Sequence, residues 1–281
     1  MARIRSVPRP PVMAAAYAIT AVCGMLDAAT FLKLGEVFVE TMTGNIVLLA
    51  FSLGALGVRQ LAPAFPGGSV VPFVTALACF AAGAAAGGRL VRAGETGRRA
   101  GLASDATLIG IAALVAALTH PGPVGGPRYL VIGILALAMG IQNALLRRWG
   151  IRDLATNLMT LPLTGLLADS PLGGGGNPRA GRRGTSIVIF TVSAAAGALL
   201  TRYGALWPIL TAFTLFVLAL PMLLQPPPGD RRPPPCPQDV SLSMTGLDVV
   251  ERPRALRADN YRVTAVDRSG GWRTPAWRRR C

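Results

Sequence analysis

Long apolar segments separated by short polar stretches dominate the chain as far as Gln225. Most approach the roughly 20 residues that an α-helix needs to cross a hydrocarbon core about 30 Å thick. The segment 106–119 is shorter and must extend into flanking residues. The pattern predicts an all-α integral membrane protein with about six transmembrane helices. The six segments are 12–32, 70–90, 106–119, 129–146, 185–200 and 205–224.

Two further apolar segments, 35–56 and 153–168, are broken by the polar stretches ETMTGN and TNLMTLP. If both cross the membrane the chain has eight spans, and if neither crosses it has six. With the N-terminus inside, six spans place thirteen basic residues on the cytoplasmic side and four outside, whereas eight spans give nine and eight. Short cytoplasmic loops retain lysine and arginine, so six spans fit better.

The two polar segments are then expected to be re-entrant, because they enter the membrane and return to the same side. Irregular backbone at that depth is tolerated only where protein buries it or where it lines a wet cavity. The arginine distribution also places residues 1–11, an uncleaved basic N-terminus, in the cytoplasm of a bacterium, together with the C-terminus. The expected location is the plasma (inner) membrane, with the lipid bilayer as partner.

An internal repeat relates the halves 12–120 and 128–225. Each half would contain three crossings and one re-entrant segment, so the second half would be inverted relative to the first. Inverted repeats of this kind recur in transporters, with sites near the midplane between the halves. The matching positions are Gly24 with Gly140, Asp27 with Asn143, Ala28 with Ala144, Met42 and Thr43 with Met159 and Thr160, and Gly87 and Arg92 with Gly197 and Arg202.

Polar residues within these segments are the candidate substrate path. Asp27 lies inside the first apolar segment, where an ionised carboxylate costs several kcal/mol unless it is paired or hydrated. Thr43 or Asn45 can cap a short helix over 45–56. Glu40 belongs to the path or to the outer surface, and both readings stay open, as do packing and solute contact for the two amides of 142–143. The candidates are Asp27, Thr43, Gly44, Asn45, Gln142, Asn143 and Thr160.

Small residues spaced four apart predict close packing between helices. The positions are Gly83, Gly87, Ser193 and Gly197. The four cysteines and the lone His120 show no metal-ligand spacing, so neither a metal nor a cofactor is expected. Hydrolase, metalloprotease and phosphate-loop motifs are missing from the sequence as well, and we expect no enzyme.

Composition supports the membrane assignment, since 52% of the residues are hydrophobic and 15% are charged, against about a quarter charged in soluble domains. Although the net charge is +15, eleven of the 28 basic residues follow Gln225 and most others flank the spans, so nucleic-acid binding is not expected. The Pro- and Arg-rich tail 226–281 is expected to be disordered. Its end, WRTPAWRRRC, either holds anionic lipid head groups or is a solvated tail that reinforces the topology.

Two motifs carry a family resemblance. GMLDAATFLKLGEVFVETMTGN, residues 24–45, and GIQNALLRRWG, residues 140–150, resemble segments of the YoaK family of bacterial inner-membrane proteins, whose function is unknown. The resemblance covers about residues 12–225 and implies a membrane protein of about six spans, with no activity attached. One departure is that Leu161 and Pro162 follow Thr160, where the family commonly has glycine.

The paired polar breaks favour a transporter or channel for a small polar solute. The alternative is a membrane scaffold or sensor without transport, in which the same polar side chains hold helices together.

Overall fold

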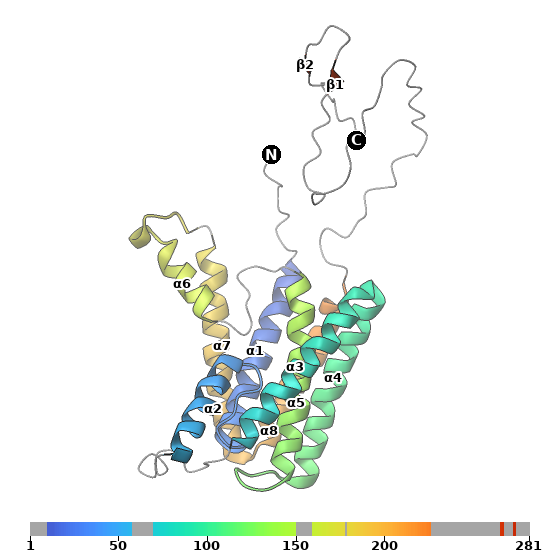
Figure 1. The fold of residues 1–281 in the computed structure, drawn as a ribbon, viewed down its shortest axis with the longest axis vertical. Helices are drawn as coiled ribbons and strands as arrows, with labels where there is room; N and C mark the ends of the chain where they lie inside the picture. Colours follow the sequence, from blue (N-terminus) through green and yellow to red (C-terminus); the bar gives the residue numbers. More distant parts are fainter. Residues whose placement is uncertain are drawn as a thin grey trace. The chain divides into compact units, whose positions relative to one another are not determined.

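The computed structural model describes residues 10–57, 70–149, 159–177, 179–225, 265–266 and 272–273. Six helices in these residues are long and apolar enough to cross a membrane, which confirms the predicted number. They are α1 (Pro10–Lys33), α3 (Val71–Arg92), α4 (Gly94–Thr119), α5 (Pro127–Trp149), α7 (Ala180–Leu200) and α8 (Leu206–Leu223) (Figure 1). The shorter helices are α2 (Met42–Gly57), α6 (Thr160–Ala168) and the 3-10 turns η2 (Pro171–Gly173) and η3 (Thr201–Tyr203).

The starts of α4 and α2 differ from those expected from the apolar segments. Helix α4 begins at Gly94, so the short segment 106–119 does extend into its N-terminal flank. Helix α2 begins at Met42, three residues earlier than expected. The expectation that Thr43 or Asn45 caps this helix is therefore wrong, because both residues lie inside it.

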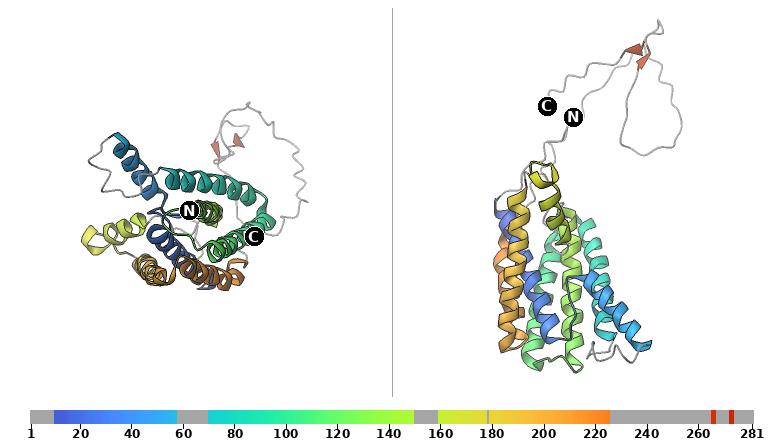
Figure 2. Two further views of the ribbon diagram at one scale, coloured as in Figure 1. Left: turned by 90° about the horizontal axis from the view of Figure 1, so that it is seen from below. Right: turned by 90° about the vertical axis from the view of Figure 1, so that its left-hand side faces the viewer.

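The spanning helices pack around α1 and α5. Helix α1 contacts α7 and α8, α5 contacts α3 and α4, and α4 closes the bundle against α8. Figure 2 shows these helices running side by side. Helices α1 and α5 are also the most enclosed of the six, with 67% and 56% of their apolar windows buried. Polar groups on these two helices are therefore the ones that the fold brings to its centre.

Glycines let α1 and α5 approach their partners at backbone distance. A Cβ atom on Gly24 of α1 would lie 2.7 Å from the carbonyl oxygen of Phe190 in α7. A Cβ on Gly140 of α5 would lie 2.7 Å from the nitrogen of Ala84 in α3, and closer still to the carbonyl oxygen of Phe80. Real Cβ atoms avoid such distances, so any side chain at either glycine would push the helices apart.

The small residues predicted to pack helices lie on α3 and α7, the partners of α5 and α1. Gly83 is so close to the α5 backbone that a Cβ would collide with the Leu137 carbonyl. A Cβ on Gly87 would lie 2.9 Å from the Ile141 oxygen, and one on Gly197 would lie 3.1 Å from the Met25 oxygen. Ser193, 5% exposed, faces Gly24 across the interface between α1 and α7.

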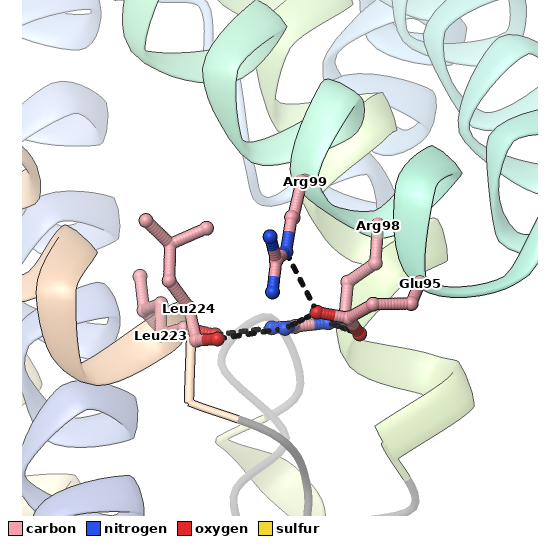
Figure 3. A network of polar contacts seen from close by, with 5 residues as sticks. All are labelled: Glu95, Arg98, Arg99, Leu223 and Leu224. Atoms are coloured by element: carbon pink, nitrogen blue, oxygen red, sulfur yellow. Dashed lines mark hydrogen bonds and ion pairs between the residues drawn. The ribbon is translucent and has the colours of Figure 1, made fainter.

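A buried arginine joins the start of α4 to the end of α8 (Figure 3). Arg98 is 6% exposed and donates to the carbonyl oxygen of Leu223 and, at 2.9 Å, to that of Leu224. Its Nε donates to Glu95 Oε2 at 2.7 Å, and Arg99 donates to the other oxygen of Glu95 at 2.9 Å. The last carbonyls of a helix have no partner within it, so Arg98 satisfies groups that α8 leaves free.

The C-terminal unit, residues 233–281, is described only at β1 (Ala265–Val266) and β2 (Trp272–Arg273). These strands pair antiparallel, with Ala265 opposite Arg273 and Val266 opposite Trp272. The pairing is regular structure that the composition of the tail did not predict. The Trp277 and Arg278–Arg280 lipid-binding candidates lie outside the described residues.

Candidate functional site

After α1 ends at Lys33, the chain turns back along the helix that it has just left. Gly35 has φ +110° and Glu36 has φ +58°, left-handed conformations that produce the reversal. The backbone N–H groups of Val39 and Glu40 then donate to Asp27 Oδ1, each at 2.9 Å. Asp27 lies six residues before the end of α1, about 9 Å along its axis. The connection 34–41 therefore returns by nearly two helical turns.

Asp27 anchors this returning connection. Its Oδ2 accepts a 2.6 Å hydrogen bond from the hydroxyl of Thr41, and the side chain is only 4% exposed. Both carboxylate oxygens are thus used by donors from the connection, two of them backbone N–H groups. Hydrogen bonds to an ionised acceptor are about twice as strong as neutral ones. The residue that the sequence placed in a solute path is engaged here in holding the connection to α1.

Asn45 fastens the same connection from the α2 side. Its Nδ2 donates to the Phe38 carbonyl at 2.6 Å, and its Oδ1 accepts from the Phe38 N–H at 2.9 Å. The Phe38 ring stacks on Phe31 of α1 with centroids 4.7 Å apart. A Cβ at Gly44 would lie 2.9 Å from the Phe38 ring, so glycine leaves room for this stack. The polar motif therefore folds largely onto itself.

Glu40 points to α5 and is 1% exposed. Its Oε2 accepts a 2.9 Å hydrogen bond from Nδ2 of Asn143, which also donates to the Met139 carbonyl at 2.9 Å. Its Oε1 is buried and has no hydrogen-bond partner among the described residues. Burial, with a smaller contribution from the Asp27 carboxyl, raises the pKa of Glu40 to about 8. The structure thus resolves the open position of Glu40 in favour of the interior.

Two more buried polar side chains are linked to Glu40, Gln142 through Cys23 and Asp105 through its electrostatic interaction with Glu40. Gln142 of α5 is 1% exposed, donates weakly to Cys23 Sγ at 3.5 Å, and has no partner for its Oε1 among the described residues. Asp105 of α4 is fully buried, and neither of its oxygens has such a partner. The carboxyls of Asp27, Glu40 and Asp105 all act electrostatically on Cys23, so these side chains lie in one region of the bundle. We call Glu40, Asp105 and Gln142 the acceptor cluster.

Asp105 is the site residue that the apolar pattern missed. It immediately precedes the apolar segment 106–119 and resembles a charged flank. A helical reading would have found it, because Asp105 continues the buried face of α4 at the spacing of a helix. The buried residues of α4 are Gly97, Arg98, Gly101, Leu102, Asp105, Ile109, Ala112, Ala113 and Ala116.

Two predicted site residues lie apart from this cluster. Thr43 is exposed on α2. Thr160 is exposed at the start of α6, a helix that packs on α7. Residues 156–158, the start of the polar stretch TNLMTLP, lie outside the described residues. Among the described residues, no group of three histidine, cysteine, aspartate or glutamate side chains could hold a metal ion.

The chain has relatives whose descriptions name no activity. The model of the family described as protein of unknown function (DUF1275) matches residues 15–222. The chain is 28% identical over 151 residues to the UPF0700 transmembrane protein YoaK of Bacillus subtilis (strain 168), an alignment that covers 52% of this chain and 61% of that protein. No solved structure matches. Because the family model matches most of the chain and overlaps all six apolar helices, the protein belongs to the DUF1275 family of multi-pass membrane proteins.

Proposed function

We propose that the protein is a transporter or channel for a small polar solute, and that the acceptor cluster lies on the solute's path. One observation carries this proposal. Four acceptor oxygens, on Glu40, Asp105 and Gln142, are buried without partners among the described residues. Each buried polar group left unsatisfied costs about 1–3 kcal/mol. A path that brings water or solute to the cluster supplies the missing donors.

The helix contacts support a duplicated architecture. Gly24 meets Phe190 and Gly140 meets Phe80, a correspondence that follows the proposed repeat. The repeat also pairs Gly87 with Gly197, and these two glycines make corresponding contacts, Gly87 with Ile141 and Gly197 with Met25. Helices α1 and α5, the first of each half, run in opposite directions (Figure 1). An inverted repeat is a recurrent design of transporters.

The connection 34–41 supports the re-entrant reading of the first polar segment. It leaves the end of α1, returns to the level of Asp27, and passes into the short apolar helix α2. Buried irregular backbone of this kind is tolerated in a bilayer where protein groups satisfy it. The carboxylate of Asp27 does so for Val39 and Glu40.

The chemistry of the cluster favours a solute that carries hydrogen-bond donors. Its free groups are acceptors, and the groups that act most strongly on its carboxyls are amides, other carboxyls and Cys23 rather than arginine or lysine. An anion would meet like charge, whereas a polyol, an amine or an amino acid brings O–H or N–H groups.

A scaffold or sensor is the second candidate, and one observation favours it. The polar side chains of Asp27, Thr41 and Asn45 form hydrogen bonds to other groups of the protein. Polar residues with such contacts can serve packing alone.

Flux into proteoliposomes distinguishes the two. We expect the purified protein to carry at least one member of a panel of polyols, amines, amino acids and inorganic ions. Gln142→Leu, which removes a free acceptor, should reduce that flux by 10-fold or more, as expected when a contact worth about 1.4 kcal/mol or more is lost. The matched control is Thr43→Val on the exposed face of α2. Absence of flux for the whole panel, or equal flux in Gln142→Leu, would favour the scaffold.

We also propose that the protein lies in the bacterial inner membrane with both termini in the cytoplasm, as the arginine distribution indicates. Val124, 85% exposed between α4 and α5, should then face outward, and Leu172, 93% exposed in η2, should face the cytoplasm. Single cysteines at these positions in a cysteine-free background can be tested with an impermeant thiol reagent on intact cells. Labelling at Leu172→Cys without labelling at Val124→Cys would reverse the orientation.

A further inference from the structure

Glu40 and Asp105 are two buried carboxyls that come from separate parts of the fold, and the Glu40 carboxyl acts electrostatically on Asp105. Glu40 belongs to the connection held on α1, and Asp105 belongs to α4. Each is at most 1% exposed. Among the described residues, the amide of Asn143 donates to Glu40 Oε2, while Glu40 Oε1 and both oxygens of Asp105 are buried without a hydrogen-bond partner.

The charges around the pair make two ionised carboxylates costly. On α1, the facing titratable groups are Asp27, which is itself acidic, and the Cys23 thiol. Helix α5 contributes the neutral amides of Asn143 and Gln142, and helix α8 has no charged residue in its sequence. On α4, Arg98 precedes Asp105 by seven residues, about 10 Å along the helix, and its guanidinium is bound to Glu95 and α8.

A second feature points to a missing donor at this place. Gln142 Oε1 is buried and has no partner in the part of the chain that the structure describes, although the Nε2 of the same amide donates to Cys23. A neutral carboxylic acid would supply what the cluster lacks, because protonation converts an acceptor oxygen into an O–H donor.

We propose that Glu40 and Asp105 form a proton-binding site at the centre of the bundle. A proton from water adds to a carboxylate oxygen to give a carboxylic acid, and the reverse step returns it to water, so no other reactant is needed. On Glu40 the proton goes to Oε1, since Asn143 donates to Oε2. This deepens the proposed function by naming the coupling ion, and proton binding can be measured without a known solute.

Infrared difference spectroscopy of the full-length protein in lipid, titrated between about pH 5 and pH 9, tests the site. The wild type should show a carboxylic-acid carbonyl band that disappears as pH rises. Glu40→Gln and Asp105→Asn keep the side-chain size and remove an ionisable group, and each should remove or shift the band. Glu36→Gln is the matched control, because Glu36 is exposed in the same connection. Size-exclusion chromatography establishes that each variant is folded.

A wild-type protein without a titrating band, or variants with an unchanged band, would overturn the proton site. A band that responds to sodium at constant pH would also overturn it in favour of a monovalent cation. If the band behaves as expected while proteoliposomes carry no solute, the proton site stands and the transport function fails. If solutes are carried without a titrating band, the opposite holds.

Discussion

Removal of the Asp27 carboxylate should release the connection 34–41 from α1. In Asp27→Ala the backbone N–H groups of Val39 and Glu40 lose their partner inside the protein. A buried donor left unpaired costs about 1–3 kcal/mol, so two such donors cost roughly 2–6 kcal/mol before any rearrangement. The Thr41 hydroxyl is partly exposed and water can replace its bond, so Thr41→Val should cost about 1 kcal/mol.

Hydrogen–deuterium exchange measures this release directly. The amides of Val39 and Glu40 should be protected in the wild type and lose protection by about 30-fold or more in Asp27→Ala, the equivalent of 2 kcal/mol. Thr41→Val should show a smaller loss, and Thr43→Val, on an exposed residue of the same type, should show none. Unchanged exchange of Val39 and Glu40 in Asp27→Ala would show that the carboxylate is not the anchor.

Three further perturbations test other parts of the fold. Gly140→Ala should lower the melting temperature by several degrees, since overpacking costs about 1–3 kcal/mol, while Gly88→Ala, with open space around it, should not. Because the pKa of Glu40 is raised to about 8, its ionisation should destabilise the folded state: the melting temperature should fall as pH rises from about 5 to 8 and fall less in Glu40→Gln. Arg98→Met should lose about 2 kcal/mol of stability through the freed α8 carbonyls. Arg99 is exposed and, among the described residues, binds Glu95, so Arg99→Met should lose far less; equal losses in the two would refute the capping role.

The spanning helices could be predicted from the sequence because the bilayer imposes a length on each apolar segment. Helix α4 shows where that rule is incomplete: its first part is rich in charged and small residues, yet it continues the helix as far as Gly94. Helix α2 shows a second limit. Thr41, the residue before its start, donates to Asp27 in α1, and Asn45 inside it binds Phe38 of the connection, contacts that no local capping preference contains.

The site was predictable in part. Asp27 and Asn45 were found because polar side chains in apolar sequence need a partner, but which partner they have depends on how the chain reverses after α1. The burial of Glu40 depends on that reversal as well. Asp105 was missed since a carboxylate beside an apolar segment is indistinguishable from a flank until its helical face is known.

In the proposed repeat, the two halves differ in their polar residues rather than in their packing residues. Their packing glycines make corresponding contacts, as Gly24 and Gly140 show, so the close approach of helices does not distinguish one half from the other. Asp27, by contrast, would correspond to neutral Asn143 in that repeat, and both side chains act on the same connection: Asp27 binds the Glu40 backbone and Asn143 binds its carboxyl. Glu40 is therefore held by groups of both α1 and α5, and a relative movement of these two helices would have to change its contacts. This gives a physical reason why proton binding at Glu40 would be coupled to the arrangement of the bundle.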